Sequence, residues 1–174
     1  MKEQTVVPTK NERFFPEDEI IVSKTDLKGV ITYANQTFLT IAGYTEEEIL
    51  GQPHNIIRHP DMPRCVFKLL WDTLEMKQEI FAYVKNMAKN GDFYWVFAHV
   101  TPSFDDRGNV IGYHSNRRVP ERRQVELFAQ IYEQLLAEER RHSDWRAGMH
   151  AAGEMLGQMI ASRNMAYEEF IFSV

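Results

Sequence analysis

The chain of 174 residues contains one cysteine, Cys65, so it cannot form a disulfide within itself, and such a composition suits a reducing compartment. It has no apolar run approaching the roughly 20 residues that a membrane-spanning helix needs, and its start lacks the apolar core of a secretory signal. We therefore expect a cytoplasmic protein with no direct membrane insertion. Because Cys65 precedes apolar residues, it is expected to be a small buried side chain rather than a reactive thiol.

Basic residues do not outnumber acidic ones: 20 Lys and Arg stand against 25 Asp and Glu, for a formal net charge of -5. A nucleic-acid partner normally requires a concentrated basic face, so none is expected. The chain also lacks a glycine-rich phosphate loop, a nucleophile elbow and a paired-carboxylate motif, and we do not expect an enzyme. With 44% hydrophobic residues, it can bury one substantial core, which predicts one domain with an appendage.

Short β-branched and alternating runs predict a sheet in the first two thirds of the chain. Asn90-Gly91 is a strong hairpin signal between two of these runs. Two strands, several short helices and three further strands, in that order, predict an α+β fold with a five-stranded antiparallel sheet and short helices on one face. The predicted strands cover residues 20–24, 30–33, 80–88, 93–101 and 109–117.

Helix starts are marked between the second and third predicted strands. Asn35 can cap a short helix, and Thr45 with Glu48 forms a capping box for another. Apolar residues then recur at helical spacing, which predicts a longer helix from about Met62 to Met76.

Two further helical patterns follow Pro120, each with one apolar stripe, and Ser143 is a candidate cap for the second. These helices can pack onto the domain as a helical hairpin, or they can pair with a second copy in a homodimer, and both alternatives stay open. The expected divisions are an N-terminal arm or cap (1–17), the main domain (18–119) and a C-terminal helical extension (120–174).

The segment Gly51–Pro63 combines two histidines, an arginine, an aspartate and three prolines in thirteen residues. Proline fixes φ and removes a backbone donor, so the segment can be neither a continuous helix nor a central strand. It is expected to be a rigid loop that orients polar side chains toward a ligand. The alternative is a self-contained network of His, Arg and Asp within the loop.

Three segments carry a resemblance to a known family. They are GYTEEEILGQPHNIIRHPDMP (43–63), VKNMAKNGDFYWV (84–96) and GNVIGYHSNRR (108–118). In wording, order and spacing, residues 18–118 resemble the flavin-binding PAS domains of aerotaxis and energy-taxis receptors (the Aer/CetB-like family). The short ending at 167–172 is similar to PAS-only energy-taxis proteins of the CetB type.

The resemblance implies a PAS domain that binds FAD as a redox sensor for aerotaxis or energy taxis. It also implies a partner, a membrane-bound transducer of the methyl-accepting chemotaxis type, which would recruit the protein to the inner face of the membrane. The alternatives are a haem-binding oxygen sensor, with His54, His59 or His114 as the iron ligand, and a cofactor-free interaction or dimerisation module. Light sensing through a cysteinyl-flavin bond is not expected, because His54 stands where that family has its cysteine.

The same resemblance supplies the candidate site. Arg58, His59 and Asp61 match family residues associated with holding FAD, and Asn86 is expected to offer its carboxamide to the flavin ring. An arginine suits the pyrophosphate, whereas Asp61 is expected to orient Arg58 or to cap a helix. The full set of expected cofactor-binding residues is Asn35, His54, Asn55, Arg58, His59, Asp61, Phe67, Trp71, Asn86 and His114.

Strand alternation then assigns the two faces of the sheet. With Asn86 facing the ligand, the inward residues are Ile80, Ala82, Val84, Tyr94, Val96, Ala98, Val100, Gly112, His114 and Asn116. The outward face would expose Phe81, Tyr83, Trp95 and Phe97 unless a helix, the N-terminal arm or a partner covers it. We expect this face and the C-terminal helices to carry the output.

Overall fold

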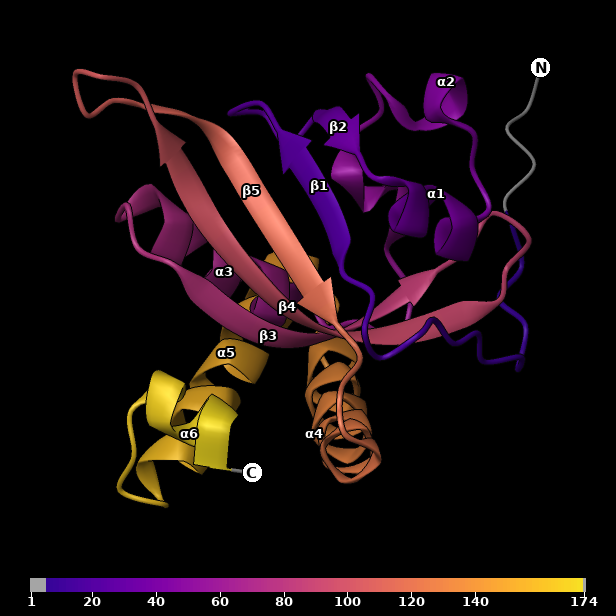
Figure 1. Cartoon of the computed structure of the whole chain (residues 1–174). Helices are drawn as coiled ribbons and strands as arrows, with labels where there is room; N and C mark the ends of the chain where they lie inside the picture. Colours follow the sequence, from indigo (N-terminus) through magenta and orange to yellow (C-terminus); the bar gives the residue numbers. More distant parts are fainter. Residues whose placement is uncertain (1–5, 174) are drawn as a thin grey trace.

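The computed structural model describes residues 6–173, which form one antiparallel sheet of five strands in the order β2-β1-β5-β4-β3, flanked by helices (Figure 1). This arrangement confirms the predicted α+β fold, and the strands start close to their predicted positions. β4 is longer than expected and continues to Phe104. The strands are β1 (Ile21–Thr25), β2 (Ile31–Ala34), β3 (Ile80–Met87), β4 (Phe93–Phe104) and β5 (Val110–Arg118).

The helices occur in two groups along the chain. Between β2 and β3 lie α1 (Gln36–Ala42), α2 (Glu46–Ile49), the 3-10 helix η1 (His54–Ile57) and α3 (Arg64–Glu75). After β5 come α4 (Arg122–Arg140), α5 (Trp145–Ala161) and α6 (Tyr167–Ser173).

The sequence-predicted helix starts are confirmed in the first group. Asn35 Oδ1 accepts from Phe38 N at 3.1 Å, and the Thr45 and Glu48 capping box is complete. These caps satisfy backbone N–H groups that have no partner within the helix. At the start of α5 the expected cap was wrong by one residue, because Asp144, not Ser143, accepts from Ala147 N at 2.8 Å.

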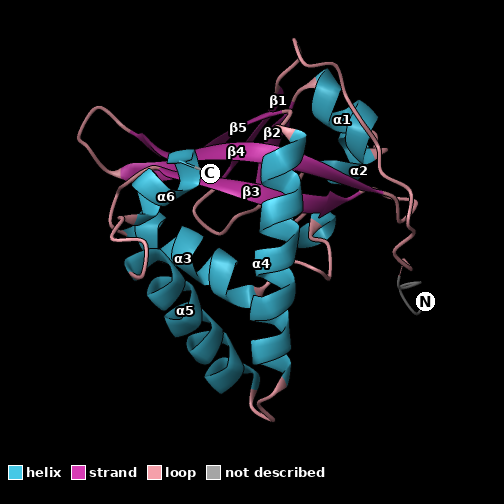
Figure 2. Ribbon diagram, turned by 90° about the horizontal axis from the view of Figure 1, so that it is seen from below, coloured by secondary structure: helices cyan, strands magenta, loops and turns pink. Residues whose placement is uncertain are grey.

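Helices cover both faces of the sheet (Figure 2). The first group, which includes α3, covers the face that carries Asn86, which we call the inner face. The helices α4 and α6 cover the opposite, outer face, and α5 runs back beside α3. Among residues 6–173, no helix combines the length and the apolar character needed to cross a membrane.

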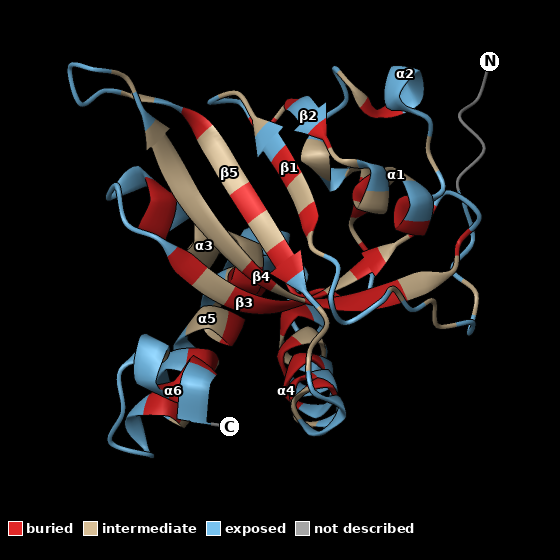
Figure 3. Ribbon diagram, in the orientation of Figure 1, coloured by how far each residue is buried: buried red, intermediate tan, exposed pale blue. Residues whose placement is uncertain are grey.

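The helix α4 packs on the outer face through stacked aromatic rings. Phe128 lies over Tyr83 with ring centroids 4.3 Å apart, and the Tyr132 ring is 6.1 Å from that of Trp95. The Tyr132 hydroxyl donates to the carbonyl of Tyr83 at 2.6 Å, which satisfies a buried donor. Figure 3 shows the resulting line of buried residues along α4.

The helix α6 completes this cover. The ring of Phe172 is 4.7 Å from that of Phe81 and 5.8 Å from that of Phe97, and the Tyr167 hydroxyl donates to the Phe81 carbonyl at 2.7 Å. The outer aromatic face is therefore covered by the chain's own helices. The sequence left open whether the C-terminal helices pack onto their own domain or pair with a second copy. In the structure they pack onto their own domain.

Candidate functional site

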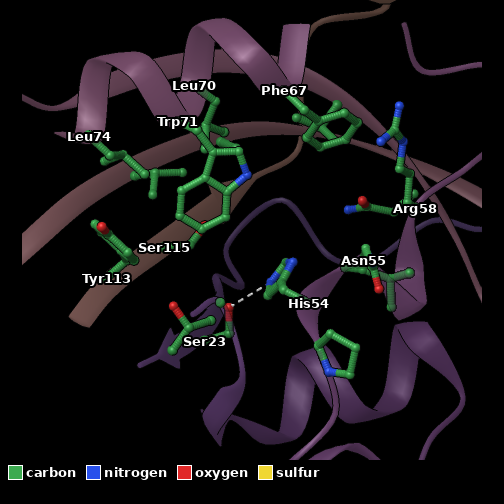
Figure 4. A pocket seen from close by; sticks show the side chains of 18 of the residues that line it. Ser23, His54, Asn55, Arg58, Phe67, Leu70, Trp71, Leu74, Tyr113 and Ser115 are labelled. Atoms are coloured by element: carbon green, nitrogen blue, oxygen red, sulfur yellow. Dashed lines mark hydrogen bonds between the residues drawn. The ribbon is translucent and has the colours of Figure 1, made fainter. Parts of the chain in front are cut away.

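A cavity of about 410 Å³ opens between the inner face of the sheet, η1 and α3. Its volume falls within the range of roughly 300–1,000 Å³ that is typical of ligand pockets. Figure 4 shows Phe67 and Trp71 projecting from α3 toward His54 on the opposite side. The wall formed by α3 is apolar and aromatic, and its lining residues are Phe67, Leu70, Trp71 and Leu74.

The sheet supplies the floor of the cavity. On β3 and β4 the predicted alternation is correct, since Val84, Asn86, Ala98 and Val100 line the cavity. On β5 the prediction was wrong, because the lining residues are Tyr113, Ser115 and Arg117.

A β-bulge explains this error. Phe104 pairs with Val110, but Ser103 pairs with Gly112, so the register shifts by one residue next to the hairpin turn. Uniform pairing from the turn would have placed His114 opposite Val100, whereas Ser115 occupies that place. Because side chains alternate along a strand, one extra residue turns every later side chain of β5 to the other face.

Arg117 is the residue that the sequence reasoning missed, and it dominates the polar side of the cavity. Its side chain is buried, with 2% exposure. The Nε group donates to Ser115 Oγ at 3.0 Å, and Nη2 donates to Ser23 Oγ. Within the described residues, Nη1 has no hydrogen-bond partner. Burial lowers the pKa of Arg117 to about 10, so the guanidinium is still charged at neutral pH.

No carboxylate within the described part of the chain forms a salt bridge with Arg117. Its guanidinium carbon lies 4.8 Å from the centroid of the Phe38 ring, which supplies only a weak cation-π contact. A buried charge without a counter-ion is costly unless another group accepts its hydrogen bonds. The cavity therefore presents a cationic donor to whatever occupies it.

His54 is held beside Arg117 as a neutral ring. Its Nε2 lies 3.0 Å from Arg117 Nη2 and 3.2 Å from Ser23 Oγ, and the imidazole stacks on Phe38. Burial and the charge of Arg117 lower the pKa of His54 to about 3. Because an arginine can only donate, Nε2 is the acceptor, and the ring proton lies on Nδ1.

Asn86 and Arg58 lie on the same side of the cavity and form an isolated antiparallel bridge through their backbones. Asn86 is buried, yet its carboxamide makes no hydrogen bond with the described residues, so both its donor and its acceptor are available. The Arg58 guanidinium lies 4.3 Å from the centroid of the Phe67 ring and donates from Nη2 to the Met62 carbonyl at 3.2 Å.

The structure thus brings six of the expected site residues to one cavity: His54, Asn55, Arg58, Phe67, Trp71 and Asn86. The other four do not line it. Asn35 is occupied as the cap of α1, where its amide also donates to the Ile20 carbonyl at 2.7 Å. His114 lies on the outer face, with its Nε2 3.0 Å from Asn116 Oδ1. Its expected place at the cavity was wrong, because the β-bulge turns this part of β5 to the other face.

His59 and Asp61 form a local network behind the cavity wall. His59 is buried, and its Nδ1 accepts from the backbone N of Asp61 at 3.1 Å, while Nε2 has no partner among the described residues. Burial and the nearby Lys85 lower the pKa of His59 to about 4. Asp61 pairs with Lys85 at 2.7 Å. The expectation that Asp61 orients Arg58 or caps a helix was therefore wrong, and the N-cap position of α3 is held by Pro63. The loop therefore combines two of the predicted arrangements: part of it faces the cavity, and part is self-contained.

A comparison with family models matches the PAS fold over residues 31–117, which is half of the 174 residues. The chain belongs to this family. The matched region includes all of β2 to β4, β5 up to Arg117, and most of the cavity lining, although Ser23 and Thr25 of β1 precede it.

The chain is similar to part of several larger proteins, including the following two from bacteria. The chain is 41% identical to the aerotaxis receptor of Escherichia coli over 121 residues, which are 70% of this chain and 24% of that protein. It is 30% identical to the biofilm dispersion protein BdlA of Pseudomonas aeruginosa over 87 residues, which are 49% of this chain and 21% of that one. The chain thus spans about a quarter or less of the length of these relatives.

Solved structures share the fold. A light-oxygen-voltage domain studied with a flavin analogue superimposes with a TM-score of 0.57 at 23% identity, covering 66% of this chain and 86% of that one. The light-state structure of the blue-light photoreceptor Aureochrome1 LOV gives a TM-score of 0.56 at 24% identity, covering 62% of this chain and 86% of that one.

Proposed function

We propose that this protein is a redox sensor that holds FAD in the inner-face cavity and reports the redox state of the flavin to a separate chemoreceptor in the membrane. The observation that carries the proposal is the buried guanidinium of Arg117, which lines the cavity, has no counter-ion among the described residues and has a buried Nη1 without a hydrogen-bond partner there. A cofactor-free module would leave this charge buried without compensation, which is destabilising.

The residues around the cavity fit a flavin. Arg117 supplies a charged donor, Asn86 supplies a donor and an acceptor from one carboxamide, and neutral His54 extends from the loop to Arg117. The ring edge of a flavin alternates acceptors and donors, which this set can match. Phe67 and Trp71 provide the flat apolar wall that an aromatic ring system needs.

Arg58 supports the dinucleotide rather than a bare flavin ring. It lines the cavity from the loop and presents several fixed donors, which suit a pyrophosphate. Asn55 lies beside it, is exposed and adds a polar group at the same side. The resemblance of residues 43–63 to flavin-binding receptors agrees with this use.

When bound, FAD supplies a ring that exchanges electrons and protons, so the charge along its polar edge changes with redox state. Arg117 can favour negative charge there, because burial lowers its pKa only to about 10 and the guanidinium stays cationic at neutral pH. His54 is held neutral and accepts from Arg117, which keeps that guanidinium oriented. Asn86 can offer either its carboxamide NH2 as a donor or its carboxamide oxygen as an acceptor to the flavin edge.

The haem alternative receives no support from any of its three candidate histidines, one of which would have to bind the iron. His54 Nε2 faces the Arg117 guanidinium, which is a poor neighbour for a metal cation. His59 and His114 do not line the cavity. One relative is named as an aerotaxis receptor and another as a nitrogen fixation regulatory protein, and a sensory role without catalysis is accordingly part of the proposal.

The partner that we infer is a membrane-bound transducer of the methyl-accepting chemotaxis type, which would recruit this protein to the inner face of the membrane. The support is the 41% identity with a protein named as an aerotaxis receptor. Because α4 and α6 cover the outer face, a partner meets these helices rather than Trp95 itself, which is 8% exposed. A homodimer through the same helices is a second arrangement that a sedimentation measurement would detect.

The test is the visible spectrum of the purified full-length chain, with chromatography of the released cofactor. Bands at about 450 nm that disappear on dithionite reduction, with FAD as the released species, are the expected result. A Soret band would establish the haem alternative instead. A colourless protein that takes up neither FAD nor FMN on titration would overturn the proposal.

A further inference from the structure

The start of α3 depends on a residue from the C-terminal extension. Pro63 occupies the N-cap position and provides no side-chain acceptor. Glu139 of α4 supplies one instead, because its Oε1 accepts from Cys65 N at 3.0 Å, 74 positions earlier in the chain. The Glu139 side chain is buried, with 5% exposure. A distant carboxylate thus satisfies a backbone N–H group at the positive end of the helix that forms the cavity wall.

The same carboxylate lies among the arginines that flank the cavity wall. Its Oε2 is 3.6 Å from Arg64 Nη1 and has no hydrogen-bond partner within residues 6–173. Burial and the charge of Arg64 lower the pKa of Arg58, and the charge of Glu139 acts in the opposite direction. Because Arg58 lines the cavity, Glu139 interacts electrostatically with a group that faces the ligand.

The hairpin of α4 and α5 closes against α3 at this point. A Cβ added to Gly148 of α5 would lie 2.4 Å from the backbone oxygen of Glu139, so the two helices cross too closely for any larger residue. One turn further along α5, Gly153 faces Cys65, with 3.8 Å between the added Cβ and the Cys65 Cβ. The Glu139 carboxylate and Gly153 therefore contact the first turn of α3, and Gly148 allows α5 to pack closely on α4 at Glu139.

We propose that Glu139 is a positioning residue for the cavity, and that docking of the α4–α5 hairpin and occupation of the cavity are thermodynamically coupled through it. The coupling rests on the proposed function for its ligand, FAD. A shift of α3 displaces Phe67 and Trp71 together, since both belong to the same rigid helix. Linkage is reciprocal. If docking of the α4–α5 hairpin strengthens FAD binding, FAD binding must strengthen docking of the hairpin by the same factor.

Exchange of Glu139 for glutamine tests the coupling, because E139Q keeps the shape and removes the charge. We expect FAD to bind E139Q about tenfold more weakly than the wild type, within the range of roughly 5–150-fold that is typical of coupled sites. The exposed Glu133 on the same helix provides the matched control, and E133Q should bind FAD like the wild type. G148A should weaken binding as E139Q does, because its Cβ pushes the hairpin away without touching the carboxylate.

Hydrogen exchange separates coupling from a merely structural role. FAD should slow exchange in residues 145–161 of the wild type, and this protection should be lost or strongly reduced in E139Q. A variant that unfolds at lower urea concentration but binds FAD with wild-type affinity, and in which FAD still protects α5, would overturn the proposal.

The outcome stays decidable if the cofactor assignment fails. Should the wild type bind no FAD, the proposed function falls, and exchange in the ligand-free proteins decides the coupling. Faster exchange in both residues 64–68 and residues 145–161 of E139Q would support it. Faster exchange in only one of these segments would contradict it.

Discussion

The two faces of the sheet are built from the same strands but serve opposite purposes. On the outer face, Tyr83 and Trp95 are packed against the rings of Phe128 and Tyr132 from α4. On the inner face, alternate residues of these strands border a cavity of about 410 Å³ that contains the buried charge of Arg117. The outer face is covered by the chain's own helices, whereas the inner face retains a cavity.

This difference separates stability from binding within one layer of the molecule. Removing a ring from the outer face should cost folding free energy and leave the ligand affinity of the folded protein unchanged. Removing the charge of Arg117 from the inner face should weaken ligand binding and leave the folding free energy unchanged. The reason is that a buried ion without a counter-ion contributes little or nothing to stability.

The largest expected effect is on the outer face. F128A removes a buried ring that contacts Tyr83 and should lower the free energy of unfolding by about 3–5 kcal/mol. Urea unfolding measures the loss, with F104A as the exposed control. If F128A were as stable as the wild type, the outer face would not be the stabilising one.

The next effect is on binding. R117M should weaken FAD binding by about 100-fold, equivalent to roughly 3 kcal/mol for the loss of charged hydrogen bonds. The ligand-free variant should be as stable as the wild type or more stable, since methionine fills the space without a charge. R118M, on the exposed next residue, is the control for both measurements. Equal affinities for R117M and R118M would remove the main support for the site.

The third effect is a pH dependence from His54. Its pKa is about 3 in the folded protein and about 6.5 when unfolded, so below pH 6.5 the unfolded chain binds a proton that the folded chain does not. Stability is therefore fully present above pH 6.5 and is lost as the pH falls, by about 1.4 kcal/mol for each unit. His59, with its pKa of about 4, acts in the same direction.

Urea unfolding of the ligand-free protein at about pH 7 and about pH 5 isolates the contribution of His54. H54N cannot titrate, so its stability should fall by about 2 kcal/mol less than that of the wild type over this interval. The exposed His150 provides the control, H150N, which should follow the wild type. An unchanged slope in H54N would mean that this ring is not held neutral.

The smallest effect concerns Asn86. N86A should weaken FAD binding by about five- to tenfold, as expected for the loss of one or two neutral hydrogen bonds. Titration with FAD measures it, and N116A on the outer face is the control. Identical binding by N86A would mean that the carboxamide does not contact the ligand.

Much of this architecture is predictable from the sequence because it depends on local patterns. Once the family resemblance has placed Asn86 inward, alternation places Val84 inward as well, and the capping box at Thr45 starts α2. The position of Arg117 is not predictable in the same way. It depends on one extra residue in β5 near the turn, and no side chain there distinguishes a bulge from uniform pairing.

The contacts between distant segments were equally inaccessible. The apolar stripe of α4 indicates that the helix has a face to bury, but either the sheet or a second chain could cover it. Likewise, Glu139 lies in a run of mixed charge that resembles a solvated helix end, and only the tertiary structure brings it to Cys65.

A crystal structure of the full chain grown with FAD tests the central claim most directly. The account predicts that the flavin ring lies between α3 and the inner face, with its polar edge within hydrogen-bonding distance of Arg117 Nη1 and the Asn86 carboxamide. A flavin bound elsewhere, or an Arg117 turned away from it toward a carboxylate of the protein, would contradict the account.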